Sequence, residues 1–297
     1  MLAGVLALGA CSNPDSGSNA NLDTSSNYSV NTNSDSSKTQ TTIVNVASRY
    51  DSVEVWDAVN KLLEADNIKV VNKAYDAAVN LNDLLIAGDV DLNVAQHYAA
   101  IDYFKSADKK YDVLVPLGDI HISTIDLYSN KYKDVNELPN GANIAIPNDA
   151  MNGGRALMVL AKADLITLDS NYVGFPDETN ITANPKNFHF VKIDSSSMIR
   201  VLDDVDAGFA YSLNAVDANL NPIIDPILND KLDLQNDATQ KQFVIVFTGV
   251  NGDEKNEVYQ KVVKAFHNDE VYKVYKEVYK GGNIPVADGK PIDLSKF

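Results

Sequence analysis

Hydrophobic and polar positions follow two alternating patterns from Thr42 to the end of the chain. Short β-branched or continuous apolar runs predict strands, and apolar residues spaced three or four positions apart predict helices. The predicted strands are 42–47, 68–71, 113–117, 143–147, 188–193, 207–210 and 243–247. The predicted helices are 52–64, 81–87, one that follows residues 152–155 and runs to 163, and 254–280 with a break at 267–269. This alternation predicts an α/β fold with parallel sheets flanked by helices.

The segment before Thr42 has a different composition. Residues 12–41 contain 22 Ser, Asn, Asp or Thr among 30 positions, with almost nothing able to enter a core. Because such a segment cannot offset the entropy lost on ordering, we predict a flexible tether over residues 11–41, with Cys11 at its start.

Cys11 is the only cysteine, which excludes an intramolecular disulfide and a cysteine-based zinc site. The apolar run 1–10 before it is shorter than the roughly 20 residues of a membrane span and resembles the end of a signal peptide. No Lys or Arg precedes this run, so we expect the signal peptide to be incomplete at its start. Leu8-Gly9-Ala10-Cys11 matches a lipobox, which predicts lipidation of Cys11 and anchoring at the extracytoplasmic face of the cell membrane.

The charge balance excludes several classes of partner. The chain has 25 Lys and Arg against 41 Asp and Glu, a formal net charge of −16. Because nucleic-acid binding depends on cations that neutralise phosphates, we expect no nucleic-acid partner. The same balance disfavours docking onto anionic lipid head groups through a basic patch. With 297 residues and 45% apolar content, the chain is expected to form two lobes with sizeable cores.

One long segment carries a family resemblance. Residues 112–168, above all LYSNKYKDVNELPNGANIAIPND and NGGRAL, resemble the methionine-binding lipoproteins of ABC importers, the NlpA/MetQ family. Residues 87–97, 203–207 and 267–285 fit the same family in the same order, so the resemblance covers about 255 residues.

The resemblance implies a two-lobed periplasmic-binding-protein fold of type II, with the ligand in the cleft. It places lobe one at 42–116 plus 250–297 and lobe two at 120–243, with hinges near 117–119 and 248–249. The implied function is capture of methionine or a related amino acid and its delivery to an ABC permease and ATPase complex. We expect a monomer without catalytic residues, metal or cofactor.

Arg155 is the first candidate for the ligand site. We predict that it lies in the first turn of a helix, where free backbone N–H groups favour an anion and a guanidinium can clamp a carboxylate. The resemblance implies that it holds the α-carboxylate of the ligand. Gly153 and Gly154 are expected to let the ligand approach the backbone. From the residues alone, phosphate binding and a surface arginine capping its own helix remain alternatives.

Further candidates rest mainly on the resemblance. His97 matches a position that faces the cleft, although a hydrogen-bonded histidine at a strand end is the alternative. Tyr211 stands where the family has a ligand-binding asparagine, and Asn214 lies three residues further on. Tyr50, with Arg49 before it, follows the first strand at the expected mouth of the cleft, where the family has a Pro/Gly-rich loop.

Three family positions that grip the thioether with aromatic rings are Ala78, Ala95 and Ala100 in this chain. Loss of these rings favours a larger amino acid or a short peptide as an alternative ligand. A binding protein that has lost its ligand and acts as a surface adhesin or scaffold is a further alternative. An enzyme is disfavoured because the four histidines occur without HExxH and the chain has no GxSxG.

Overall fold

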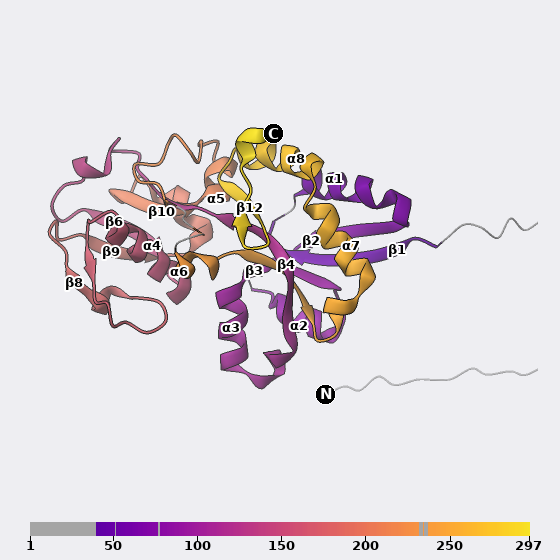
Figure 1. Cartoon of the computed structure of the whole chain (residues 1–297). Coiled ribbons are helices and arrows are strands. Elements are labelled where there is room, and N and C mark those ends of the chain that lie inside the picture. Colours follow the sequence, from indigo (N-terminus) through magenta and orange to yellow (C-terminus); the bar gives the residue numbers. More distant parts are fainter. Residues whose placement is uncertain (1–39, 51, 77, 232–233, 235–236) are drawn as a thin grey trace, which may run out of the picture. The chain divides into compact units, whose positions relative to one another are not determined.

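The computed structural model describes residues 40–297 apart from 51, 77, 232–233 and 235–236 (Figure 1). The predicted signal peptide, Cys11 and nearly all of the predicted tether lie outside the described residues. The first strand begins at Thr42, where the sequence predicted the start of the folded body. No helix in the described part of the chain combines the length and the apolar character that crossing a bilayer requires.

A seven-stranded sheet in the order β13-β12-β4-β11-β3-β1-β2 forms the larger lobe, which we call the large-sheet lobe. Its strands are β1 (Thr42–Ser48), β2 (Ile68–Ala74), β3 (Leu92–His97), β4 (Leu114–Ser123), β11 (Ile245–Val250), β12 (Asn283–Ala287) and β13 (Lys290–Pro291). β1 runs parallel to β2 and β3, whereas β11 runs antiparallel to β3 and β4. The prediction of a parallel sheet is therefore right for β1–β3 and wrong for the rest of this sheet.

Helices cover both faces of the large sheet (Figure 1). The helices α1 (Val53–Leu63), α7 (Glu257–Phe266) and α8 (Asp269–Tyr279) pack on one face, and α2 (Leu81–Ala87) and α3 (Tyr98–Ala107) pack on the other. Along β1, Val44 and Val46 belong to the first core and Ala47 to the second, because successive side chains of a strand point to opposite faces.

A four-stranded sheet in the order β5-β10-β6-β9 forms the second lobe, which we call the small-sheet lobe. Its strands and helices are β5 (Ile125–Tyr128), β6 (Asn143–Pro147), β9 (His189–Ile193), β10 (Ala207–Tyr211), α4 (Ala150–Lys162), α5 (Ser212–Asp217) and α6 (Ala238–Lys241). The pair β7 (Thr167–Leu168) and β8 (Ile181–Ala183) forms a separate two-stranded sheet. β6 is parallel to β9 and β10, and β5 is antiparallel to β10, so this sheet is also mixed.

Short 3₁₀ helices occur in the connections of both lobes. They are η1 (Glu64–Asp66), η2 (Lys109–Val113), η3 (Val135–Glu137), η4 (Glu178–Asn180), η5 (Ser195–Val201), η6 (Asp253–Lys255) and η7 (Leu294–Lys296).

The C-terminal helices pack their tyrosines inward. Tyr272, Tyr275 and Tyr279 are each 5% exposed or less. The helix break falls where the sequence predicted it, and Asn268 caps α8 by accepting a hydrogen bond from the Glu270 N–H. This tyrosine-rich stretch is therefore part of the core of the large-sheet lobe.

The chain crosses from the large sheet to the small sheet at Thr124, which separates β4 from β5. The predicted hinge positions 117–119 and 248–249 lie inside β4 and β11 of the large sheet. The lobe boundaries remain predictions.

Candidate functional site

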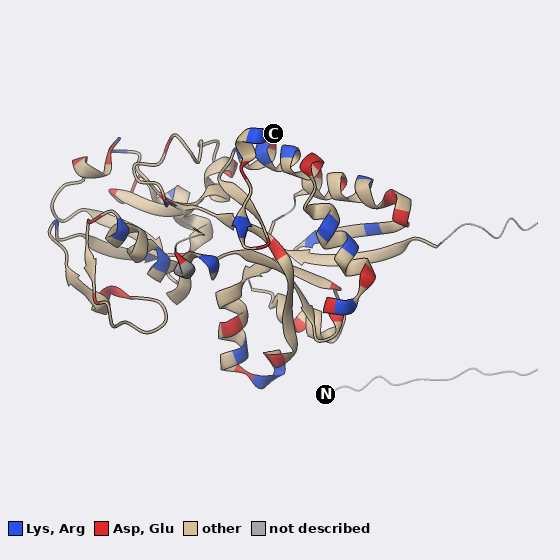
Figure 2. Cartoon of the chain, in the orientation of Figure 1, with Lys and Arg blue, Asp and Glu red and all other residues tan. Residues whose placement is uncertain are grey.

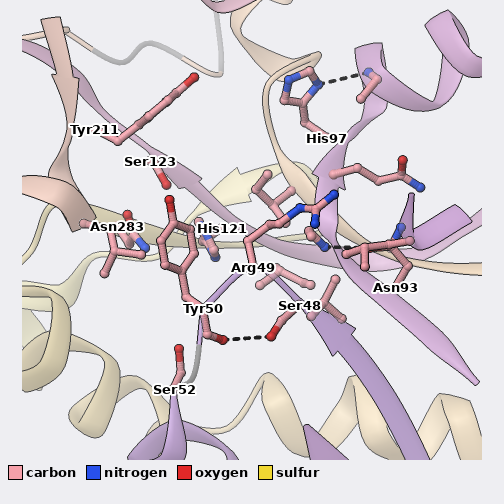
Figure 3. A pocket seen from close by; sticks show the side chains of 18 of the residues that line it. Ser48, Arg49, Tyr50, Ser52, Asn93, His97, His121, Ser123, Tyr211 and Asn283 are labelled. Carbon is pink, nitrogen blue, oxygen red and sulfur yellow. Dashed lines mark hydrogen bonds between the residues drawn. The ribbon is translucent and has the colours of Figure 1, made fainter. Parts of the chain in front are cut away.

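A cavity of about 510 Å³ lies between the two lobes (Figure 3). On the large-sheet side it meets the carboxyl ends of β1 and β3, which end at Ser48 and His97. On the small-sheet side it meets α4 and Tyr211, the last residue of β10. The carboxyl ends of parallel strands are the usual position of ligands in open α/β sheets.

Arg155 lines this cavity and is buried, with 5% of the residue exposed. It lies in the second turn of α4, not in the first as predicted, because the helix begins at Ala150. Its Nη2 donates to the carbonyl oxygen of Ser123 at 2.8 Å and to Oδ2 of Asp230 at 2.6 Å. The guanidinium carbon stands 4.8 Å from the centre of the Phe243 ring. The alternative of a surface arginine capping its own helix is therefore wrong.

The same guanidinium keeps unused donors. Both N–H groups of Nη2 are used by Ser123 and Asp230, whereas Nε and Nη1 of Arg155 bond to no residue within the described part of the chain. The two edges with which arginine grips a carboxylate through parallel hydrogen bonds both include Nη2, so Nη1 and Nε can each donate only a single charge-assisted hydrogen bond to a ligand. Arg155 is therefore fixed through Nη2 and available through Nη1 and Nε.

Gly153 and Gly154 do not line the cavity. A Cβ on Gly153 would lie 2.6 Å from the carbonyl oxygen of Pro147, and one on Gly154 would lie 2.8 Å from Pro176 O and Phe175 Cβ. The two glycines let α4 pack closely against β6 and the loop at 175–176. The expectation that they let the ligand approach the backbone is therefore wrong. They let α4 pack closely, and this packing positions Arg155.

His97 lines the cavity and also caps α3. Both interpretations of this residue, a side chain that faces the cleft and a hydrogen-bonded histidine at a strand end, therefore apply. Its Nδ1 accepts a hydrogen bond from the Ala100 N–H at 3.0 Å, which places the proton of the neutral ring on Nε2. Burial, followed by the positive charge of Arg155, lowers the pKa of His97 to about 4. At neutral pH the ring is an uncharged hydrogen-bond donor packed edge-on against Phe243.

Arg49 and Tyr50 leave β1 at the cavity, as the sequence predicted (Figure 3). Arg49 donates to the carbonyl oxygens of Tyr75, Asp76 and Val79 at 3.3, 2.5 and 2.9 Å, and so holds the neighbouring loop. Burial lowers its pKa. Arg49 is a second cation of the cavity wall, tied to the backbone.

Tyr211 lines the cavity, whereas Asn214 does not. Burial raises the pKa of Tyr211, so the hydroxyl stays protonated and uncharged. Tyr50 is 45% exposed at the cavity, and Oδ1 of Asn214 is buried without a hydrogen-bond partner in the described part of the chain.

Ala78, Ala95 and Ala100 all line the cavity, on the side of α2 and α3. Aromatic side chains also line it, which the sequence reasoning missed: Phe104 on α3 beside Ala100, Phe243, and Trp56, Phe266, Tyr275 and Tyr279 on α1, α7 and α8. Their only signal in the sequence was apolar patterning, which equally indicates core packing.

His121 is a further cavity residue without any motif in the sequence. It lies on β4, and its Nδ1 stands 2.5 Å from the hydroxyl of Tyr275. Burial lowers the pKa of His121 to about 3, so its ring is neutral.

A buried amide network supports the floor near β3. Asn82 Nδ2 donates to Gln96 Oε1, Asn93 Nδ2 donates to Asn82 Oδ1, and Gln96 Nε2 donates to Asn82 Oδ1, at 2.8 to 2.9 Å. Gln96 also reaches Thr248 Oγ1 at 3.2 Å. Because these side chains satisfy one another, they act as framework of the cavity wall.

The cavity has the opposite charge to the chain. Two of the three arginines line it, and no Asp or Glu does so among the residues that the structure describes. Outside the cavity, Lys, Arg, Asp and Glu follow one another along α1, α7 and α8 (Figure 2). The described residues contain no group of three His, Cys, Asp or Glu side chains arranged to hold a metal ion. Both arginines already have partners, Arg155 in Asp230 and Arg49 in backbone carbonyl oxygens, so the wall can receive a ligand carboxylate without carrying two unpaired positive charges.

Two α/β lobes with a ligand-sized cavity between them define a substrate-binding protein of the two-lobed kind that ABC transporters use. The family model described as NlpA lipoprotein matches residues 12–287, and the chain belongs to this family. Similar solved structures include substrate-binding proteins of transporters.

Relatives and solved structures agree with this assignment. The chain is 32% identical over 219 residues to a probable D-methionine-binding lipoprotein MetQ of Pasteurella multocida, covering 74% of this chain and 76% of the relative. A nutrient-binding protein of Burkholderia cenocepacia bound to methionine is 30% identical, with a TM-score of 0.73 over 82% of this chain and 99% of that one. The substrate-binding protein of a methionine transporter from Streptococcus pneumoniae is 30% identical, with a TM-score of 0.72 over 82% and 95%.

Proposed function

We propose that the protein captures methionine or a related amino acid and delivers it to an ABC permease and ATPase complex. The observation that carries this proposal is Arg155, a buried arginine that lines the cavity between the lobes and keeps its Nη1 and Nε donors unused. The neutral Nε2–H donor of His97 and the hydroxyl groups of Tyr50 and Tyr211 supply further polar contacts. The names of the relatives support methionine as the first ligand to test.

The same proposal includes the cellular setting. The protein acts as a monomer, held at the extracytoplasmic face of the membrane by lipid on Cys11, and performs no catalytic step. Binding, closure of the lobes and docking on the permease make up its whole cycle, as expected for two lobes around a ligand.

A larger ligand is the second candidate, and the three cavity alanines favour it. The cavity of about 510 Å³ lies within the range of about 300–1,000 Å³ that is usual for small-molecule sites, which leaves room for a ligand longer than methionine. A longer amino acid or a short peptide would fill the space beside Ala78, Ala95 and Ala100.

Calorimetric titration of the wild-type chain distinguishes these ligands. We expect saturable binding of one molecule of L-methionine, a longer amino acid or a methionine-containing dipeptide per chain, and much weaker binding of L-methioninamide. The amide is the control because it lacks the carboxylate that Arg155 is proposed to clamp. If no amino acid or short peptide binds or raises the melting temperature, the transport proposal fails and the adhesin or scaffold alternative gains support.

Replacing Cys11 with serine tests the anchor. Because the thiol is the predicted attachment point, the wild-type chain is expected to incorporate a labelled fatty acid and to sediment with membranes when it is produced in bacteria. Cys11→Ser is expected to lose both properties while keeping its ligand affinity. Equal labelling of the two proteins would contradict the anchoring proposal.

A further inference from the structure

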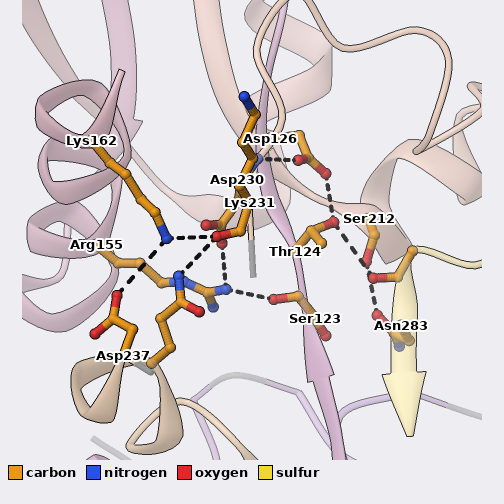
Figure 4. A network of polar contacts seen from close by, with 12 residues as sticks. Ser123, Thr124, Asp126, Arg155, Lys162, Ser212, Asp230, Lys231, Asp237 and Asn283 are labelled. Carbon is orange, nitrogen blue, oxygen red and sulfur yellow. Dashed lines mark hydrogen bonds and ion pairs between the residues drawn. The ribbon is translucent and has the colours of Figure 1, made fainter. Parts of the chain in front are cut away.

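Asp230 stands directly behind the ligand-binding arginine (Figure 4). The side chains of Arg155 and Asp230 are only 6% and 4% exposed, and their charged atoms are 2.6 Å apart. Arg155 lines both the large cavity and a second cavity of about 450 Å³, whereas Asp230 lines only the second one. Asp230 therefore does not line the ligand cavity, and its charge can act on a bound ligand only through the guanidinium of Arg155.

The small sheet fixes the position of Asp230. The backbone N–H of Asp230 donates to Oδ1 of Asp126 at 2.8 Å, and Oδ2 of Asp126 accepts from the Thr124 hydroxyl at 2.5 Å. Just before Asp230, Ile227 and Leu228 form backbone hydrogen bonds with Leu127 of β5. These bonds hold the carboxylate against Arg155 from a rigid element of the same lobe.

The pair has a consequence for the charge of the bound ligand. Arg155 and Asp230 together are neutral, and both lie out of water, where an uncompensated charge is costly. A ligand with a carboxylate alone would leave Arg155 between two carboxylates, and this group of three would have a net negative charge. The second cation of the wall, Arg49, directs its guanidinium at backbone carbonyl oxygens. An amino acid brings its own ammonium group, so the complex remains neutral.

We infer that Asp230 is a specificity-determining residue that acts through Arg155 and makes the site select zwitterionic amino acids over simple carboxylate anions. The inference rests on the proposed function, because it assumes that Arg155 holds the ligand carboxylate. It assigns a role in ligand selection to a residue outside the ligand cavity.

The test compares two probes on the full chain: L-methionine and desaminomethionine, which is methionine without its amino group. Wild type is expected to bind methionine at least about tenfold more tightly. Asp230→Asn keeps the shape of the side chain but removes its charge, so the ratio of the two affinities is expected to fall by about tenfold. A ratio is informative here because loss of arginine positioning would weaken both probes together.

Two variants serve as controls. Asp230→Glu keeps the negative charge and is expected to keep the wild-type ratio within about threefold. Asp119→Asn removes a buried carboxyl from β4 that lines neither cavity, so its replacement is expected to leave the ratio unchanged.

Each outcome decides a different question. A wild-type ratio near one, or a wild-type ratio retained by Asp230→Asn, overturns the inference while leaving amino-acid binding intact. If wild type binds neither probe nor any amino acid, the proposed function fails and the inference fails with it. If Asp230→Asn does not fold, Asp230→Ser provides the same charge removal, and the wild-type ratio is decisive without any variant.

Discussion

Replacing Arg155 with alanine is expected to weaken methionine binding by about ten- to a hundredfold. The unused Nη1 or Nε of the guanidinium can donate a charge-assisted hydrogen bond to a carboxylate, which contributes about 1.5–3 kcal/mol. No other described cation of the cavity replaces it, since Arg49 is tied to the carbonyl oxygens of Tyr75, Asp76 and Val79. Calorimetry on the two proteins measures the loss. Wild-type affinity in Arg155→Ala would refute the assignment of the carboxylate clamp.

The same substitution is expected to lower the free energy of unfolding by about 3–5 kcal/mol, because it leaves the Asp230 carboxylate buried without its partner. Urea unfolding measures this change. Arg200→Ala is the matched control, since Arg200 is exposed and its replacement is expected to change stability by at most about 0.5 kcal/mol. Replacing Arg155 and Asp230 together is expected to recover part of the stability without recovering binding, which separates the two effects.

The second large effect is sensitivity to acid. The pKa of His97 is lowered to about 4 by burial and by the charge of Arg155, whereas an unfolded chain has a histidine pKa of about 6.5. Between these two pH values the unfolded state binds a proton that the folded state does not, so the free energy of unfolding falls as the pH falls. The loss over this range is about 3 kcal/mol, and it ends below the folded-state pKa.

His97→Asn is expected to remove this loss. Asparagine is a favoured N-cap residue, so its side chain can accept the Ala100 N–H bond that His97 Nδ1 now accepts, while it does not titrate. Urea unfolding at pH 7 and pH 4.5 gives the change for each protein. His189→Asn is the control, because His189 is exposed. An acid-induced loss in His97→Asn as large as that of wild type would contradict the explanation.

The elements that the sequence predicted most accurately are those with simple local signals. The helix Leu81–Ala87 ends at Gly88, and the strand Asn143–Pro147 is a continuous apolar run that is buried over most of its length. The strand Leu92–His97 was anticipated only at its end, through the alternative for His97, because Asn93 and Gln96 occupy buried positions where both bond to Asn82 of α2. A polar residue in a sequence cannot reveal that its hydrogen-bond partner is provided by a distant element.

The candidate site was predictable to the extent that a motif marked it. NGGR identified Arg155, although the glycines place the helix and do not face the ligand cavity. Asp230 follows Arg155 by 75 positions and belongs to no motif, so only the folded structure brings the two charges together. His121 and Tyr275 had no signal beyond ordinary core patterning, because a side chain that lines a cavity and one that fills a core look alike along the chain.

The two sides of the cavity differ in how freely evolution can alter them. Trp56, Phe266 and Tyr275 line it from α1, α7 and α8 and also form the core of the large-sheet lobe, so changing them would weaken the fold together with the site. Ala95 and Ala100 line the side of β3 and α3 with small side chains, and neither is among the buried residues of the two cores of this lobe. Divergence in ligand preference among related chains is therefore expected to accumulate on the alanine side, while the aromatic side stays fixed.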